Sequence, residues 1–483
     1  MKQIKCMRWA GIAAIVSLAA GFPVPAGAAE KESSDSESAG CIGAGAEATQ
    51  ETEDNPTETG EDPADFDLSS LPLLVHAADP VERIGEGQDP EAFQYSEEYS
   101  AWWNSHLEAQ QASADLQPSL AAFYEKTMQE LLADDGETNA VCSPVNLYFA
   151  LAMLTECTGG ETQGQLLDFL GADSLQNLRK TADAVWNATA QDTPLAEILP
   201  ANSLWMNQDV AFRDDTLQTL AERYHVSSFA GDLSGQEANR ALHTWINENT
   251  NHLLEQQADA MQMDADTVLA LISTLYYKAS WQESFAKEDT TEEVFYGKTD
   301  LTVPMMHQEL HAMVYSGDGF RALPLSLSAG TMWIFLPNDA DGVGQLASNP
   351  EVIRLVQNPE AEGISSQFAN VRLSLPRFDA ASRLSLADSL QKLGVTKIFE
   401  SQADFTPLIE EPGCFVSQIE HAARVQADED GVEAAAFTAV KMEGTALIEE
   451  NIDFTVDRPF LFVLTGDDGS ILFTGLVNRP EEA

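Results

Sequence analysis

Residues 139–154 read NAVCSPVNLYFALAML, a helix start that leads into an almost wholly apolar run. Ser143 precedes Pro144, and proline fits the first turn of a helix because the amide hydrogen it lacks would have no partner there. A glycine pair at 159–160 ends this helix. A second helix is expected over 161–171, whose last residue is a glycine stop. The stretch therefore predicts two consecutive helices.

Helical and strand patterns alternate from about residue 113 to the end of the chain, with no obvious linker. Apolar residues ahead of the first stretch recur at helical spacing: Leu120, Phe123, Tyr124, Met128, Leu131 and Leu132. A further helix is expected at 245–254. Strands are expected at 269–277, 331–336, 371–375, 460–464 and 471–477. Because neither a βαβ repeat nor a short internal period appears, the pattern predicts an α+β fold around one large sheet system.

The chain is strongly acidic. Its 483 residues include 78 Asp and Glu against 25 Lys and Arg, a formal net charge of -53. Such a polyanion repels phosphate backbones and anionic lipid headgroups, which argues against nucleic-acid and membrane-surface binding. The hydrophobic fraction of 44% excludes a disordered acidic protein, since it suffices for a sizeable core. Length alone suggests about two or three domains.

The first 28 residues are expected to be a signal peptide. Lys2, Lys5 and Arg8 precede an apolar run at 9–22, and small residues suited to cleavage follow. The chain is therefore expected to be secreted and extracellular. An uncleaved anchor and a lipid anchor at Cys41 are the alternatives.

Two further segments precede the main body. Residues 29–67 are acidic and almost without apolar side chains, and are expected to be a disordered tail or spacer. Residues 68–112 form an N-terminal extension with a strand at 71–75 and a helix with an aromatic face (Phe93, Tyr95, Tyr99, Trp102, Trp103 and Leu107). This extension either packs on the body or offers a docking surface. The body itself is expected to span 113–483.

Neither the cysteines nor the histidines indicate a metal or a cofactor. Five cysteines are too few for a disulfide scaffold, and Cys6 leaves with the signal. The disulfide state of the others is left open: Cys41, Cys142, Cys157 and Cys414. The histidines at 307 and 311 resemble a zinc-protease motif, but the glutamate lies one position late and the segment reads as a strand. No G-x-S-x-G nucleophile is found, so a hydrolase is not supported.

Residues 432–443 alternate with a period of two. One set is small and mostly apolar (Val432, Ala434, Ala436, Thr438, Val440 and Met442), and the other carries all the charges (Glu433, Ala435, Phe437, Ala439, Lys441 and Glu443). This pattern is typical of a strand with one buried face. The alanine run is helix-prone, so propensity alone would favour a helix.

Several motifs together resemble the serpin family of serine protease inhibitors. The first are the stretch at 139–154 and Gly160-Glu161-Thr162. The others follow in the family's order: 276–281 with Trp281 and Phe285, Val303-Pro304-Met305-Met306, Leu375-Pro376-Arg377-Phe378, Leu393-Gly394-Val395, Ala403-Asp404-Phe405, Arg458-Pro459-Phe460 and Leu472-Phe473-Thr474-Gly475. The resemblance is collinear over about 115–483.

The resemblance implies a single large domain with three β-sheets, about nine helices and an exposed reactive-centre loop. It implies a secreted, bacterial inhibitor that is not an enzyme. A target protease would cleave the loop and form an acyl-enzyme, and the freed hinge would insert into the main sheet. A non-inhibitory serpin acting as an extracellular binding protein is the alternative, although such members usually lose the small hinge residues.

The resemblance also assigns site residues. The hinge comprises Gly431, Val432, Glu433, Ala434, Ala435 and Ala436, and the bulky Phe437 departs from the family on the outward face. The reactive bond is Thr445–Ala446, whose small residues suit elastase-like or subtilisin-like serine proteases. Met442 or Leu447 beside the bond would instead suit chymotrypsin-like or cysteine proteases.

The polar cluster under the sheet, the shutter, comprises Ser143, Asn146, Ser273 and His421, and Trp281 marks the breach. The family usually has Ser where Asn146 stands and Asn where Ser273 stands, which suggests a compensating exchange. Around Leu178 only Arg179 and Lys180 are basic, so no heparin-type polyanion is expected to bind. The protein is expected to be a monomer.

Overall fold

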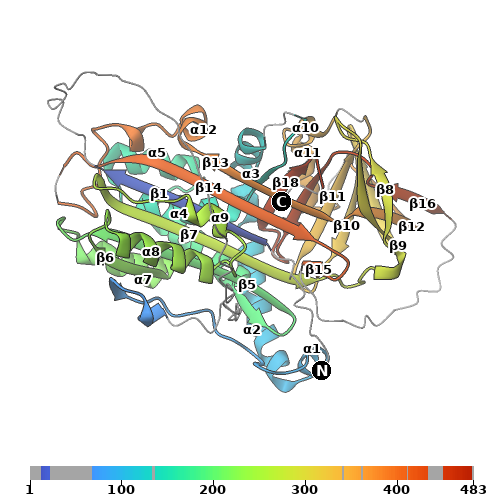
Figure 1. Cartoon of the computed structure of the whole chain (residues 1–483), viewed down its shortest axis with the longest axis horizontal. Coiled ribbons are helices and arrows are strands. Elements are labelled where there is room, and N and C mark those ends of the chain that lie inside the picture. The colour runs from blue at the N-terminus through green and yellow to red at the C-terminus, as the bar shows by residue number, and fades with distance from the viewer. Residues whose placement is uncertain are drawn as a thin grey trace, which may run out of the picture.

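The computed structural model describes residues 12–21, 68–132, 136–339, 342–360, 363–410, 412–432 and 450–480. Its architecture is α+β, with two networks of hydrogen-bonded strands flanked by helices (Figure 1). The sequence prediction of an α+β fold around a large sheet system is confirmed.

The main sheet has seven strands on its path. In spatial order they are β13 (Phe378–Ser385), β14 (Phe415–Ala427), β1 (Ile12–Gly21), β7 (Thr267–Ser280), β5 (Ala196–Asn207), β6 (Val226–Gly231) and β2 (Leu74–His76). Two short strands pair at its margins, β4 (Gln191–Thr193) with β5 and β15 (Gly431–Val432) with β7. Eleven of the fourteen residues of β7 lie in one buried run from its start, as expected for a central strand whose two faces are both covered.

The second network runs β16 (Asn451–Thr455), β12 (Ser365–Pro376), β9 (Leu301–Gly317), β10 (Phe320–Ser326), β11 (Thr331–Pro337), β17 (Phe460–Thr465), β18 (Ile471–Val477) and β3 (Ala140–Cys142), with β8 (Thr291–Phe295) beside β9. The 17-residue β9 pairs with β8 near its start and with β10 at its end. Strand β9 therefore belongs to two sheets of this second network. Together with the main sheet they make the three β-sheets that the sequence analysis expects.

Twelve α-helices occur within the described ranges, against the nine or so expected, because several have only one turn. They are α1 (Pro90–Gln94), α2 (Glu97–Ala114), α3 (Gln117–Leu131), α4 (Pro144–Glu156), α5 (Gly160–Phe169), α6 (Leu175–Thr189), α7 (Asp214–Tyr224), α8 (Gln236–Glu248), α9 (Glu255–Asp259), α10 (Val343–Leu346), α11 (Pro350–Gln357) and α12 (Ala387–Lys392). None of the helices in the described residues is long and apolar enough to cross a bilayer.

The helix expected at 245–254 was misplaced. Helix α8 begins at Gln236 and ends at Glu248, and residues 249–254 form turns. The prediction began at Trp245 because the first half of α8 has few apolar residues. Its apolar side chains nevertheless lie on one face that is buried, which is typical of an amphipathic surface helix.

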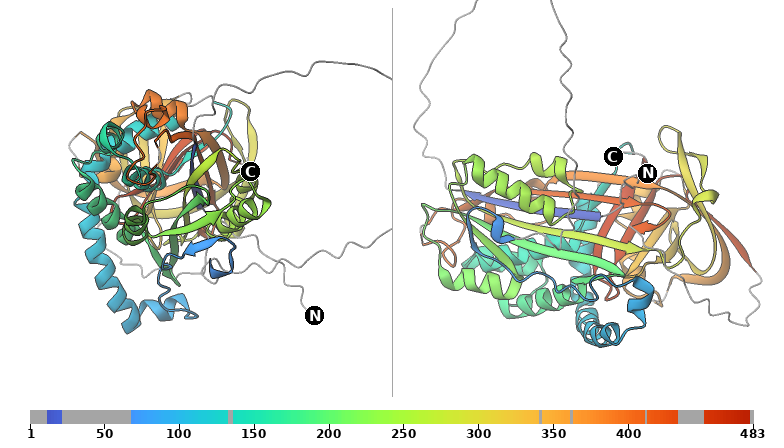
Figure 2. Two further views of the ribbon diagram at one scale, coloured as in Figure 1. Left: turned by 90° about the vertical axis from the view of Figure 1, so that its left-hand side faces the viewer. Right: turned by 60° about the horizontal axis from the view of Figure 1, so that its bottom comes forward.

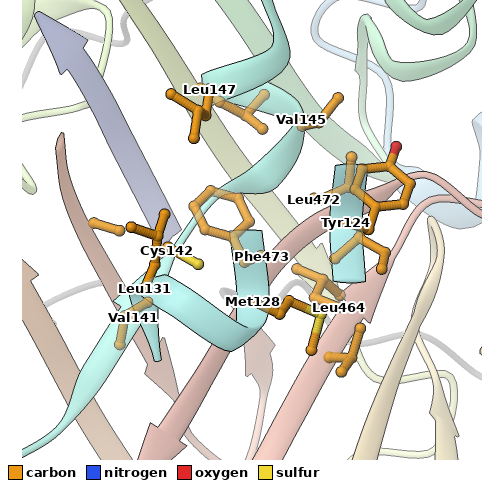
Figure 3. Close-up of a cluster of buried hydrophobic side chains, with 14 of the residues drawn as sticks. Tyr124, Met128, Leu131, Val141, Cys142, Val145, Leu147, Leu464, Leu472 and Phe473 are labelled. Atoms are coloured by element: carbon orange, nitrogen blue, oxygen red, sulfur yellow. The ribbon is translucent and has the colours of Figure 1, made fainter. Parts of the chain in front are cut away.

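Helix α4 forms the centre of the molecule, since every one of its residues is buried. The Ser143 hydroxyl caps it by accepting a hydrogen bond from the Asn146 amide, as the sequence predicted. In the core beside it, Val145 and Leu147 lie near Leu472 and Phe473 of β18 (Figure 3). The helix thus packs against both strand networks and can couple them.

The N-terminal extension lies on the body. Helix α2 runs along the outside of the molecule, beside α6 (Figure 2). At its end Ser113 Oγ donates to the buried carboxylate of Asp468, 2.5 Å away, in the turn between β17 and β18. Gln110 Nε2 donates to the neighbouring Asp467 carboxylate at 3.3 Å. Buried polar contacts of this kind fix the extension to the domain.

Strand β1 lies between β7 and β14 and is antiparallel to both (Figure 2). Its Val16 pairs with Ser273 on one side and His421 on the other. These residues belong to the apolar run that the sequence analysis assigns to a signal peptide. In the full chain this run supplies an interior strand of the main sheet.

Removing residues 1–28 is expected to leave the facing edges of β7 and β14 without their shared partner. Amide hydrogen exchange in 269–277 and 416–425 should then become at least tenfold faster, because each interior strand loses its ladder on one side. Exchange measured by mass spectrometry on chains 1–483 and 29–483 tests this. A chain lacking only 30–64 is the matched control and should exchange like the full chain. Equal protection in chains 1–483 and 29–483 would contradict the prediction.

Candidate functional site

The candidate site is the strand position between β7 and β14. At one end of it β15 pairs with β7, Gly431 opposite Ser280 and Val432 opposite Ala279. Strand β1 begins two positions further along the same edge, with Ile12 opposite Tyr277. The segment predicted as the hinge therefore starts in line with a strand position that another part of the chain occupies.

Gly431 meets two demands that only glycine satisfies. Its φ of +132° lies in a region that side chains with a Cβ rarely adopt. A Cβ here would also lie 2.7 Å from both Ser280 Cα and the Trp281 amide nitrogen. The predicted hinge therefore leaves β14 through a turn built for close approach to β7.

The four predicted shutter residues come together under the sheet, and all are fully buried. The Ser143 amide donates to His421 Nε2 at 3.0 Å, and the Ser143 hydroxyl donates to the Leu472 carbonyl at 2.6 Å. This places α4, β14 and β18 in one hydrogen-bonded group. The sequence analysis assigned these residues from the resemblance alone. In the structure Ser143 contacts His421 and Asn146 directly, and Asn146 connects Ser273 to them.

Asn146 and Ser273 contact each other directly. Ser273 Oγ donates to Asn146 Oδ1 at 2.5 Å, and Asn146 Nδ2 donates to the Ser273 carbonyl at 3.1 Å. The pair thus links α4 to the middle of β7. A serine and an asparagine in exchanged places could make the same contact, so the proposed exchange is compatible with this geometry.

Trp281, predicted as the breach residue, lies at the end of β7 beside the hinge. Its indole Nε1 donates to the Asp428 carbonyl at 2.8 Å, and its ring packs edge-on against Phe285, with centroids 6.0 Å apart. The Phe285 amide donates to the Glu429 carbonyl at 3.0 Å. These contacts hold the segment that precedes the hinge.

Glu429 is a functional candidate that sequence reasoning missed. Its side chain is 2% exposed and forms an ion pair with Arg377, while the Thr290 hydroxyl donates to it at 2.6 Å. Burial works to raise the pKa of Glu429, but the hydrogen bonds from Arg377 and Thr290 outweigh it and hold the pKa below its usual value. The only sequence signal was a carboxylate two positions before the hinge, and local pattern could not reveal the distant arginine.

The rest of the predicted site lies outside the described residues. This applies to the remaining hinge residues (Glu433, Ala434, Ala435 and Ala436), to Phe437, and to the predicted reactive bond Thr445–Ala446. Cys41, the alternative anchor position, is outside them as well.

The cysteines of the described part, Cys142, Cys157 and Cys414, are free and buried. Burial raises the pKa of the Cys142 thiol to about 12, so it is an unreactive core group. His307 lies in β9, where Nδ1 is 3.1 Å from the Ser374 hydroxyl. Within the described ranges no three His, Cys, Asp or Glu residues are grouped as metal ligands.

Comparison with known proteins identifies related sequences and structures. The family model described as "Serpin (serine protease inhibitor)" matches residues 118–480. Serpin-ZX of Arabidopsis thaliana is 27% identical over 366 residues, 71% of this chain and 92% of the relative. A serine protease inhibitor of Cyanea capillata is 25% identical over 395 residues, 77% of this chain and all of the relative (100%).

Among solved structures, native tengpin, a thermophilic serpin, has a TM-score of 0.64 at 22% identity, covering 75% of this chain and 93% of its own. AtSerpin1 of Arabidopsis in its native stressed conformation has a TM-score of 0.64 at 25% identity, covering 77% and 98%. At such identities the structural likeness with tengpin shows the fold alone.

Exchanging the two shutter residues tests their coupling. Asn146→Ser or Ser273→Asn alone should each cost about 1–3 kcal/mol of stability, because a buried polar group loses its partner. The double variant Asn146→Ser/Ser273→Asn should recover at least about 1 kcal/mol of that loss. Denaturant unfolding of the four proteins measures the cycle. Strictly additive effects would show that the pair is not coupled.

The Glu429–Arg377 pair predicts an acid-sensitive hinge region. Because the pKa of Glu429 is lowered in the folded state, its contribution is fully present above the ordinary Glu value of about 4.3 and is lost as the pH falls through the lower folded value. Glu429→Gln should therefore cost about 1 kcal/mol at pH 7, and the difference from the parent protein should shrink towards pH 3. Thermal unfolding from pH 7 to 3 tests this, with Glu292→Gln on β8 as the exposed control. A pH-independent difference would contradict the prediction.

Proposed function

Because this chain belongs to the serpin family, which the match over residues 118–480 establishes, we propose that it is a secreted inhibitor of serine proteases that inserts its cleaved loop into the main sheet. The observation that carries the proposal is the register of β15, which runs towards the strand position between β7 and β14.

Continuing this register along β7 gives each loop residue a partner. Val432 pairs with Ala279, so Ala434 would reach Tyr277, where Ile12 now pairs. By the same count Thr438 would reach Ser273, the partner of Val16. Residues 434–442 would take the positions of 12–20, so the loop matches the length of the available position.

The same register sorts the loop residues by face. Ser273 is hydrogen-bonded to Asn146 of α4, so residues in register with Ser273 lie on the face that α4 covers. That set is Ala434, Ala436, Thr438, Val440 and Met442, which has no charge. Glu433, Lys441 and Glu443 would lie on the opposite face. This agreement favours an inhibitor over a non-inhibitory serpin that serves as an extracellular binding protein.

The proposed mechanism begins with attack by the protease serine oxygen on the Thr445 carbonyl carbon, which expels the Ala446 amine and leaves an acyl-enzyme. The freed segment then pairs with both β7 and β14 and carries the protease with it, because a fully paired interior strand is more stable than a solvated loop. Inhibition requires this movement to outrun hydrolysis of the acyl-enzyme. The small residues at 434 and 436 would favour rapid insertion, since the covered face is closely packed.

The strand position cannot hold β1 and the loop at once. We therefore propose that the inhibitor is the chain without residues 12–21, as removal of the predicted signal peptide would leave it. A chain that retains this segment would be cleaved as an ordinary substrate. The relatives named above come from plants and a jellyfish, so a bacterial source stays a prediction, as do secretion and any lipid attachment at Cys41.

The proposed targets are elastase-like or subtilisin-like proteases, because Gly444, Thr445 and Ala446 suit a shallow primary pocket. The acidic surface would attract cationic proteases at a rate that falls with added salt. That the protein is a monomer stays a prediction. Two observations support an inhibitor that needs no polyanion activator. Arg179 is bound bidentately to the buried Glu156, with both distances 2.7 Å, and the net charge opposes sulfated chains.

Incubation of chain 29–483 with elastase, subtilisin and trypsin, followed by denaturing gels, tests the proposal. Covalent complexes are expected with the first two, and Thr445→Arg should shift complex formation to trypsin. Ala436→Arg, on the inward face, should turn the inhibitor into a cleaved substrate with at least about a tenfold loss of complex. Ala435→Arg is the matched control on the outward face and should still form complexes. Loop cleavage without any complex in the parent chain would favour the non-inhibitory alternative.

A further inference from the structure

A groove of about 570 Å³ lies between helix α2 of the N-terminal extension and helix α6 of the body. Figure 2 shows α2 (light blue) as a long helix on the outside of the molecule. Small side chains from both helices line the groove and leave it open, among them Ala109, Ala112 and Ala184. The volume is within the range of small-molecule sites.

One polar side chain in this groove has no hydrogen-bond partner. His106 is only 6% exposed, yet neither of its ring nitrogens forms a hydrogen bond within the described part of the chain. Stacking on Trp102 holds the ring in place, with centroids 4.7 Å apart and an interplanar angle of 16°. The Thr189 hydroxyl is unpartnered too, but it is sealed in the core, whereas the His106 nitrogens are accessible from the groove. Because buried polar groups almost always have a partner, this imidazole indicates a ligand.

The charge state of His106 restricts the groups that can bind it. Burial lowers the pKa of His106 to about 4, so the imidazole is neutral at pH 7. A neutral imidazole has one nitrogen that donates a hydrogen bond and one that accepts. A ligand group that suits either nitrogen must itself be able to donate and to accept. A hydroxyl group does both, whereas a carboxylate only accepts and an ammonium group only donates.

The rim of the groove carries charges of both signs. Lys180 and Asp183 come from α6 and Glu108 from α2, and all three are exposed. None of them forms an ion pair with another described residue. Ser105 and Asn187 add uncharged polar groups. An anion would meet the two carboxylates and a cation would meet the lysine, whereas hydroxyl groups can accept from the ammonium group and donate to the carboxylates. The rim therefore also favours a neutral ligand rich in hydroxyl groups.

We propose that this groove binds a neutral mono- or disaccharide. Its hydroxyl groups would form hydrogen bonds with His106, Lys180 and Asp183. The apolar C–H face of a sugar ring would lie against Trp102, the aromatic side chain of the lining. The site is separate from the strand position between β7 and β14, and the proposal does not depend on protease inhibition.

The test uses the full chain and four neutral disaccharides: maltose, cellobiose, lactose and N,N′-diacetylchitobiose. Isothermal titration and saturation-transfer NMR should show saturable binding of at least one of them. Glycine and acetate, a zwitterion and an anion that could reach the same charged groups, should not displace the bound saccharide when added in large excess. Failure of all four disaccharides to saturate, with water alone filling the groove, would overturn the proposal. Displacement by glycine or acetate would overturn it as well, because charge and not hydroxyl groups would then select the ligand.

Variants locate the binding. His106→Phe keeps a ring beside Trp102 and removes both polar nitrogens, so affinity should fall about tenfold. Ala112→Trp fills the groove from α2 and should abolish binding, while Gln111→Trp, which is exposed and outside the lining, is the matched control and should bind like the parent. Thermal unfolding confirms that each variant is folded. Unchanged binding in both His106→Phe and Ala112→Trp would overturn the assignment to this groove.

Discussion

The structure depends on one constraint, the need to satisfy the facing backbone edges of β7 and β14. Strand β7 is almost wholly buried and seven of the thirteen residues of β14 are buried. The N–H and C=O groups of the two strands point at each other across the width of one strand. Unpaired backbone groups inside a sheet are costly, so the position favours any extended segment of suitable length. Strand β1, residues 12–21, fills the position here, and under the proposed mechanism 434–442 would fill it after cleavage. The proposed competition for a single interior strand position is therefore set by the backbone before any side chain is considered.

The shutter explains how this position can open. Val16 of β1 lies between Ser273 and His421, and each of these is tied from below to α4, through Asn146 and Ser143 respectively. The two strands are thus attached to the same buried helix by separate hydrogen bonds. A buried hydrogen bond is worth about 1 kcal/mol net, so each attachment defines the closed geometry without making separation of the strands prohibitive. Because α4 also touches β18, movement at the shutter reaches the second strand network.

The local sequence pattern predicted the α+β class, the helix start at Ser143 and the period-two alternation of side chains after Gly431. Each of these depends on residues that are neighbours in the sequence. The shutter came from the resemblance, and its geometry depends on contacts over more than a hundred residues of sequence. The role of 12–21 was not predictable, because an apolar run of ten residues is typical of a signal peptide and also of an interior strand. Glu429 was missed for a related reason. Its partner, Arg377, lies far away along the chain.

Under the proposed mechanism, the composition of the hinge follows from the same competition. Alanine is a weak strand former, whereas valine and isoleucine favour strands by up to about 1 kcal/mol per residue. Strong strand formers at 434–436 would stabilise insertion of the intact loop, and a loop already inserted cannot present its bond to a protease. Bulky residues facing α4 would instead slow insertion after cleavage, because the covered face is closely packed. Small residues with weak strand preference avoid both failures, and they account for an alanine run that local propensity alone assigns to a helix.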